Sequence, residues 1–147
     1  MTTEVKTMAV ETHRFEVSTK GKGQIIDITS FVAGIVERSS IKSGTVTVFI
    51  PGSTAGLTTI EYESGLVKDF TRFWDRAVPD DVEYSHNQKW HDNNGHSHVR
   101  SSLLGPSLTV PFTDKKLLIG IYQQIILVDF DVRSREREII CQLMGEN

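Results

Sequence analysis

The segment Thr45-Val46-Thr47-Val48-Phe49-Ile50 is rich in β-branched side chains and is bounded by Gly44 and Pro51. Such residues favour strands, and glycine and proline interrupt them, so a buried strand is predicted over 45–50. The small-residue loop Pro51 to Gly56 follows, and then a second strand at Thr58 to Tyr62. The loop offers backbone amides and hydroxyls to a ligand, although a plain turn has the same composition.

Upstream of this strand the pattern predicts two more strands and a helix. Side chains of two kinds alternate from Val10 to Ser18, the period of a strand with unlike faces. Gly21-Lys22-Gly23 supplies a turn, and Gln24 to Ile26 begins the next strand. Asp27 or Thr29 is suited to cap a helix that ends near Arg38.

Downstream of it the sequence predicts a helix, a long polar segment and a run of strands. The helix Ser64 to Ala77 has one apolar face, formed by Leu66, Val67, Phe70, Phe73 and Trp74, and these residues are expected in the core. Asp80 to Gly95 is polar and longer than most connections in a compact domain. We expect a short helix at Ser97 to Leu104, then strands at Ser107 to Pro111, Leu117 to Asp131 and Arg137 to Leu143.

The order of these elements favours an α+β fold in a single domain over residues 1–147. We expect a mainly antiparallel or mixed β-sheet in a barrel-like sandwich, with two main helices and a short third. Residues 1–9 are expected to form a flexible N-terminal extension.

Composition narrows the classes of function. The net charge is −3, so the sequence does not favour nucleic-acid binding, and no apolar run approaches the length of a membrane span. Cys141 is the one cysteine, which rules out an internal disulfide and fits a cytoplasmic protein. Its place on a predicted core strand makes it a small apolar residue rather than a nucleophile.

Histidines crowd into the long polar segment: four of the five, His86, His91, His96 and His98, lie beside Asp92. Imidazole is the commonest metal ligand, and three histidines can hold zinc with a position left open. On a helix, however, His96 and His98 would diverge. A bare cluster without a metal-binding motif is equally compatible with solvated loop residues that share no task, so both interpretations stay open.

Three motifs together resemble the YjbQ family: Tyr84-Ser85-His86-Asn87, then Gly95 to Ser107 (GHSHVRSSLLGPS), then Leu118 to Ile125 (LIGIYQQI). The likeness spans nearly the whole chain. It implies a small trimeric α+β protein with a secondary thiamine-phosphate synthase activity, which joins a pyrimidine diphosphate to a thiazole phosphate and releases pyrophosphate.

The resemblance also implies site residues. His86 and His98 match family histidines, Glu61 matches the glutamate after the hydroxyl-rich loop, and Gln123 matches the glutamine of the Gly-Thr-Trp-Gln signature, which here reads Gly120-Ile121-Tyr122-Gln123. Many members have a histidine where this chain has Gly52. We expect His96 to replace it, so that His86, His96 and His98 meet on one divalent metal ion, zinc or magnesium, or on one anion. No organic cofactor is predicted. His91 lacks a family match and is expected to be solvated.

The implied reaction needs donors that neutralise a departing diphosphate. Ser53 and Thr54 in the loop, and Ser101 and Ser102 near the expected start of a helix, are candidates for holding phosphate, and Arg100 is a candidate for pairing with it. A solvated helix-face arginine explains Arg100 equally well. The candidate catalytic residues are then Glu61, His98 and Gln123, and the expected partner is a phosphorylated small molecule.

Two other functions fit the same residues: a non-catalytic binder or sensor of a phosphorylated molecule, and a metal-assisted hydrolase. A homotrimer is expected from the family likeness. It is also expected because the predicted strand from Leu117 carries apolar side chains on both faces, one of which a neighbouring subunit would cover.

Overall fold

The structure, a computed structural model, describes residues 3 and 5–147, and over these the chain forms eight strands and four helices. Five strands make one sheet, in the order β1 (Met8–Thr19), β8 (Arg135–Glu146), β3 (Ser43–Phe49), β5 (Ser107–Thr113) and β6 (Lys116–Leu117). Three make the other, in the order β2 (Gln24–Asp27), β7 (Gln124–Asp129) and β4 (Ala55–Ile60). All neighbouring strands are antiparallel, so the predicted α+β class is confirmed.

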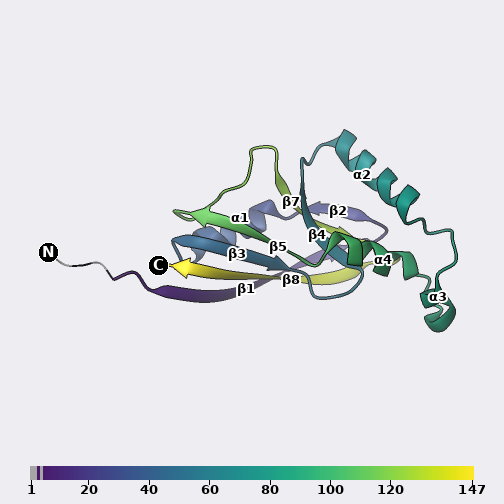
Figure 1. Cartoon of the computed structure of the whole chain (residues 1–147), viewed down its shortest axis with the longest axis horizontal. Helices are drawn as coiled ribbons and strands as arrows, with labels where there is room; N and C mark the ends of the chain where they lie inside the picture. Colours follow the sequence, from purple (N-terminus) through teal and green to yellow (C-terminus); the bar gives the residue numbers. More distant parts are fainter. Residues whose placement is uncertain (1–2, 4) are drawn as a thin grey trace.

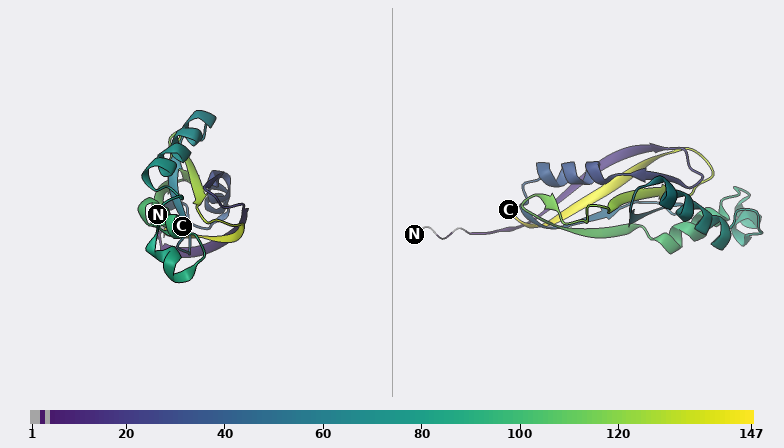
Figure 2. Two further views of the ribbon diagram at one scale, coloured as in Figure 1. Left: turned by 90° about the vertical axis from the view of Figure 1, so that its right-hand side faces the viewer. Right: turned by 90° about the horizontal axis from the view of Figure 1, so that it is seen from above.

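The four helices are α1 (Thr29–Arg38), α2 (Ser64–Ala77), α3 (Ser85–Trp90) and α4 (Gly95–Leu104). In Figure 1 the first strand, in purple, runs beside the last, in yellow, and α2 projects beyond the sheets. Seen from above in Figure 2, α2, α3 and α4 gather at the end of the molecule away from the C-terminus. Helix α3 was not predicted from the sequence, because the segment that contains it has no apolar periodicity.

The segment 45–50 forms most of β3, as predicted, at the centre of the larger sheet. Val46, Val48 and Ile50 are fully buried, and the side chains between them are more exposed, as the two-residue period of a strand requires. They join the main core, which α1 covers with Val32 and Val36. Cys141 lies in this core, and burial raises the pKa of its thiol to about 12, in keeping with a role as a small apolar side chain.

The expected long strand Leu117 to Asp131 is broken in the structure, which is a correction. It forms β6 and β7, joined by an exposed loop over residues 118–123. Within β7, Ile125 and Leu127 face the main core, whereas Ile126 and Val128 face a second cluster with Trp74 of α2. Both faces of β7 are therefore covered within its own chain, and no subunit is needed to cover this strand.

The expected N-terminal extension is also shorter than predicted. Met8 and Ala9 already belong to β1 and pair with Glu146 and Gly145 of β8. Residues 1, 2 and 4 lie outside the part of the chain that the structure describes.

The apolar face of α2 is only partly buried, which corrects the prediction that its aromatics are core residues. Trp74 is 5% exposed and packs edge-on against Phe130, whereas Phe73 is 56% exposed and Phe70 is half-buried. The helix lies over the small second cluster alone, so most of its face has no layer to pack against.

We therefore expect Phe70→Ala to lower the free energy of unfolding by about 1–2 kcal/mol, less than the 3–5 kcal/mol typical of a fully buried phenylalanine. The reason is that part of the ring is already in water. Phe73→Ala on the same helix is the matched control and should change the free energy by less than about 0.5 kcal/mol. Urea denaturation measures both, and a loss at position 70 equal to that of a core phenylalanine would contradict the burial described above.

Candidate functional site

Two ion pairs with buried carboxylates form the floor of the candidate site. Asp129, at the end of β7, accepts hydrogen bonds from Nε and Nη2 of Arg137 on β8, both at 2.8 Å. Asp131 accepts from Nε and Nη2 of Arg135 at 2.9 and 2.6 Å. The two carboxylates are 0% and 1% exposed, and buried charges persist in this way only when they are paired and hydrogen-bonded.

This pairing leaves one nitrogen on each arginine for a ligand. Within residues 3 and 5–147, Nη1 of Arg135 and Nη1 of Arg137 donate no hydrogen bond. Both arginines line a cavity of about 420 Å³, which we call the histidine cavity and which is also lined by Ser53, Thr54, His86 and His98. The guanidinium groups are thus held by the buried carboxylates, with a donor available at the cavity.

The small-residue loop forms one wall of the histidine cavity. Gly52 has a φ of +126°, and a Cβ there would lie 3.2 Å from Arg137 Nη1. The Thr54 hydroxyl donates a hydrogen bond to Asp131 and accepts one from Arg137, so it helps to hold the two ion pairs together. Over the described residues, the backbone amides of 52–54 and the Ser53 hydroxyl have no hydrogen-bond partner. A run of such amides is a common way to hold an anion.

The opposite wall carries the two histidines that match the family. His86 lies on α3 and His98 on α4, and their ring centroids are 4.3 Å apart. His86 Nδ1 lies 3.4 Å from Asp92 Oδ1, a separation suited to an ion pair but without the geometry of a hydrogen bond. The expected meeting of His86 and His98 therefore occurs, and Asp92 is placed to orient one of the imidazoles.

His96 does not join them, so the expected three-histidine convergence is wrong. It lines a different cavity, with Arg100, because helical residues two apart project about 200° from each other. Among residues 3 and 5–147, no three side chains of His, Cys, Asp or Glu are grouped as ligands for a metal ion. The residues present therefore do not fit the zinc or magnesium site that the sequence suggested, and His96 does not compensate for Gly52.

Ser101 and Ser102 also lie outside the histidine cavity. Helix α4 spans Gly95–Leu104, so both serines lie in its C-terminal half, where the helix dipole does not favour anions. The Ser101 hydroxyl donates to the Ala55 carbonyl at 2.6 Å, and that of Ser102 to the His98 carbonyl at 2.8 Å. Both hydroxyls serve the fold rather than a phosphate pocket.

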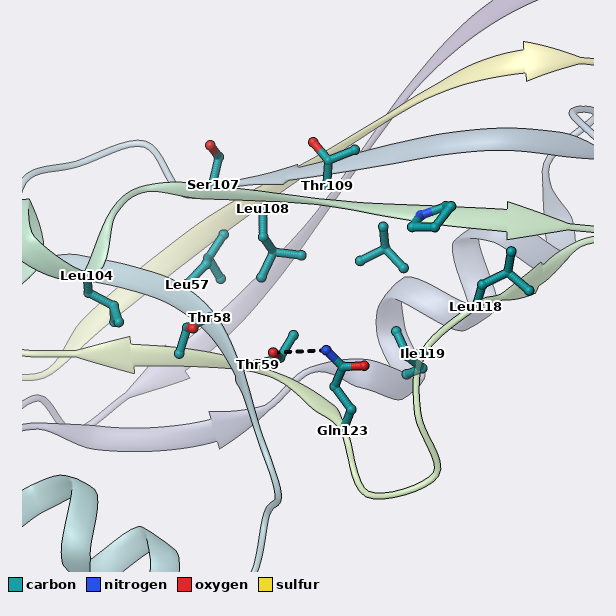
Figure 3. Close-up of a pocket in the computed structure, with 12 residues that line it drawn as sticks. Leu57, Thr58, Thr59, Leu104, Ser107, Leu108, Thr109, Leu118, Ile119 and Gln123 are labelled. Atoms are coloured by element: carbon teal, nitrogen blue, oxygen red, sulfur yellow. Dashed lines mark hydrogen bonds between the residues drawn. The ribbon is translucent and has the colours of Figure 1, made fainter.

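Gln123 lies away from the histidine cavity, and Glu61 is exposed just after β4. Gln123 lines a cavity of about 360 Å³ between the two sheets, beside Leu57 and Leu108 (Figure 3). Its amide donates to the Thr59 hydroxyl at 3.2 Å and accepts from the Gly120 amide at 3.0 Å. Within one chain, neither residue is brought to the two histidines.

The sequence analysis assigned no role to Trp90, Arg135 or Arg137, which also line the histidine cavity. Trp90 ends α3 and is 62% exposed. The arginines had a signal in the sequence. Asp129 and Asp131, then Arg135 and Arg137, are spaced by two on either side of a turn, so opposite charges lie close together where the chain passes from β7 in one sheet to β8 in the other.

Acid should weaken the ion pairs at the floor of this site, because it protonates their carboxylates. Burial by itself raises the pKa of Asp131, but hydrogen bonds from the Val132 amide, Arg135, Thr54 and Asn94 outweigh it, so the pKa lies below its ordinary value of 3.8. A carboxyl with a lowered pKa stabilises the fold above its unfolded value, and this contribution is lost as the pH falls through the folded value.

We therefore expect the free energy of unfolding to fall below a pH of about 3.8, and Asp131→Asn to flatten that part of the curve. Chemical denaturation at a series of pH values measures this. An equally steep acid loss in the variant would show that other carboxyls control it.

The model of the UPF0047 protein YjbQ-like family matches residues 13–146 of this sequence. The chain belongs to this family. A UPF0047 protein of Methanothermobacter thermautotrophicus is 37% identical over 139 residues, which cover 95% of each chain. The YugU protein of Bacillus subtilis is 29% identical over 131 residues, 88% of this chain and 96% of the relative.

Solved structures of family members share the fold. A YbjQ-like protein of unknown function from Sulfolobus solfataricus superposes with a TM-score of 0.89 at 33% identity, covering 95% of this chain and 99% of that one. A family member from Clostridium acetobutylicum gives a TM-score of 0.81 at 29% identity, covering 89% and 98%. The predicted family is therefore confirmed, and so is the predicted α+β fold with antiparallel sheets. Across the described residues, no helix is long and apolar enough to cross a membrane.

Proposed function

We propose that this YjbQ family member binds the phosphate or diphosphate group of a small molecule in the histidine cavity. The observation that carries the proposal is the set of unpartnered donors there: the amides of 52–54 and Nη1 of Arg135 and Arg137. Phosphate oxygens accept several hydrogen bonds at once, and an arginine is well suited to them. His86 and His98 add two imidazoles on the facing wall.

The reaction that the family resemblance implies, thiamine-phosphate synthesis, fits this cavity as follows. The bond between a pyrimidine methylene and its diphosphate breaks as a thiazole nitrogen bonds to the methylene. The loop amides and arginines would stabilise the charge that grows on the diphosphate, and His98 would donate a hydrogen bond to it. Trp90 at the mouth offers a ring on which a heterocycle can stack.

Glu61 and Gln123 take part in this proposal only through a neighbouring copy, because one chain keeps them apart from the histidines. This separation favours a second candidate function, a binder or sensor that captures a phosphorylated molecule without converting it. The third function considered, metal-assisted hydrolysis, loses its support, because the described residues offer no metal site.

Turnover assays separate these functions. We expect pyrophosphate release only when both the pyrimidine diphosphate and the thiazole phosphate are present, and loss of that release in Ser53→Ala. Ser102→Ala, whose hydroxyl lies outside the cavity, is the matched control and should retain it. Tight binding without product would favour the sensor, and phosphate release from one substrate alone would indicate a hydrolase.

We further propose a homotrimer, as the family likeness implies. The loop between β6 and β7 exposes large apolar side chains: Leu118 is 58% exposed, Ile121 85% and Tyr122 71%. A contiguous exposed apolar patch of this kind is typical of an interaction surface.

Light scattering at micromolar concentration should give three times the chain mass for the wild type, and a smaller mass for Ile121→Asp. The reason is that a charge buried at an interface without a partner opposes association. Lys116→Asp, at an exposed position just before the loop, is the control and should leave the mass unchanged. A wild-type monomer would contradict the trimer.

A further inference from the structure

The face of α4 that points away from His98 carries two buried polar side chains one helical turn apart, His96 and Arg100. His96 is 8% exposed and Arg100 6%. The Arg100 guanidinium carbon lies 5.9 Å from the centre of the Phe130 ring, and its Nε donates to the Val78 carbonyl at 2.9 Å. One side of the guanidinium group is thus held in place, and the other is directed toward a cavity.

Each of these side chains has a buried polar atom without a hydrogen-bond partner among the residues that the structure describes. The atoms are Nδ1 of His96 and Nη2 of Arg100. The Nη2 atom lies 3.5 Å from Asp75 Oδ1 without hydrogen-bond geometry, and that carboxylate is 67% exposed. An unsatisfied buried polar group costs about 1–3 kcal/mol, and more when it is charged. Two of them on adjacent turns point to a partner that is not part of the chain.

These side chains line a cavity of about 310 Å³, which we call the α4 cavity. Its other charged groups are Lys22, Asp75 and Asp80, all exposed to solvent. Salt and water screen exposed charges, whereas the buried Arg100 is screened much less, so the inner end of the cavity is cationic. The volume lies at the lower end of the range for small-molecule sites.

The protonation state of His96 suits a hydrogen-bond donor without a second positive charge. Burial is the largest cause that lowers its pKa below 6.5, and Arg100 lowers it further, whereas Asp80 and Asp131 raise it. The ring is therefore neutral near pH 7 and can donate one hydrogen bond beside the arginine.

We infer that the α4 cavity is a second binding site, in which the side chains of Arg100 and His96 hold the oxyanion group, carboxylate or phosphate, of a small molecule. This site is separate from the histidine cavity, because the residues that line the two lie on different sides of α4. It gives a role to His96 and Arg100, which the sequence analysis named as candidates and which do not line the histidine cavity.

The test is a titration of the full chain with sodium phosphate and, separately, with sodium acetate at constant ionic strength. The ring protons of His96 are followed by NMR. We expect at least one of the two anions to shift the His96 signals in a saturable manner, and the anion that does so identifies the oxyanion. The shift should persist in His98→Ala, which alters the histidine cavity alone. Loss of anion binding in the histidine cavity can therefore be distinguished from loss of binding in the α4 cavity.

Two exposed positions change the affinity without disturbing the core. Lys22→Asn removes a cation at the mouth and should weaken binding severalfold, and asparagine tolerates the φ of 59° found there. Asp75→Asn removes the carboxylate that competes for Arg100 and should tighten binding severalfold. The inference is overturned if neither anion moves the His96 signals at tens of millimolar, if the shift disappears in His98→Ala, or if both variants bind as the wild type does.

Discussion

His98→Ala is expected to abolish binding of inorganic pyrophosphate while leaving the thermal midpoint close to that of the wild type. His98 is half-buried, its side chain makes no hydrogen bond within the described chain, and its ring lies against that of His86 on one wall of the cavity. Truncation therefore removes a donor to the ligand and little packing, at a cost in stability of less than about 1 kcal/mol. In this respect the residue belongs to the site rather than to the core.

Pyrophosphate binding can be followed by tryptophan fluorescence, because Trp90 lines the cavity at 62% exposure whereas Trp74, the other tryptophan, is buried. The matched control is His91→Asn, an exposed position of the same segment where asparagine suits the φ of 58°. It should bind as the wild type does. If His98→Ala melts far below the wild type, His98 is a structural residue, and the proposed site loses one wall.

Asp129→Asn is expected to lower the free energy of unfolding by about 3–5 kcal/mol, because it leaves the Arg137 charge buried without its counterion. Asp129 is fully buried, the Arg137 side chain is 9% exposed, and two hydrogen bonds join them. Asp129 also accepts a hydrogen bond from Thr19, so the substitution disturbs the junction of β1, β7 and β8.

The matched control is Glu138→Gln, next to Arg137 on β8, which removes an exposed ion pair to Arg14 of β1. Exposed pairs contribute about 0.2–1 kcal/mol, so the two variants should differ several-fold in urea denaturation. A loss at position 129 no larger than that at 138 would mean that Arg137 reaches solvent once its partner is gone.

The fold was predicted well wherever a single periodicity persists. The helix 64–77 and the end of the helix at Arg38 were placed correctly, because apolar spacing is a local property of the sequence. The predicted cap of α1 was wrong, because its N-cap is Ile28, which makes no side-chain cap hydrogen bond. The break at 118–123 was missed, because an exposed apolar loop and a buried apolar strand have the same composition. Only the packing of the sheets separates them.

The candidate site was predicted in part. His86 and His98 were paired correctly through the family motifs, and Ser53 and Thr54 through the loop between two strands. His96 and Arg100 were misplaced because the start of α4 was predicted two residues late, at Ser97. Since His96 lies within the helix, it projects away from His98 and lines the other cavity with Arg100. Arg135 and Arg137 were missed although they are spaced in the same way as Asp129 and Asp131, because their role depends on the burial of these two carboxylates.

An NMR titration of the wild-type chain with pyrophosphate, which follows the ring protons of His86 and His98, tests directly whether the histidine cavity binds a diphosphate group. Both rings line the cavity that holds the unpartnered amides and arginine nitrogens. We predict that the two sets of signals shift together and saturate with a single dissociation constant, whereas those of the exposed His13 and His91 stay in place. Signals of His86 and His98 that do not move at saturating pyrophosphate would contradict an anion site in the histidine cavity.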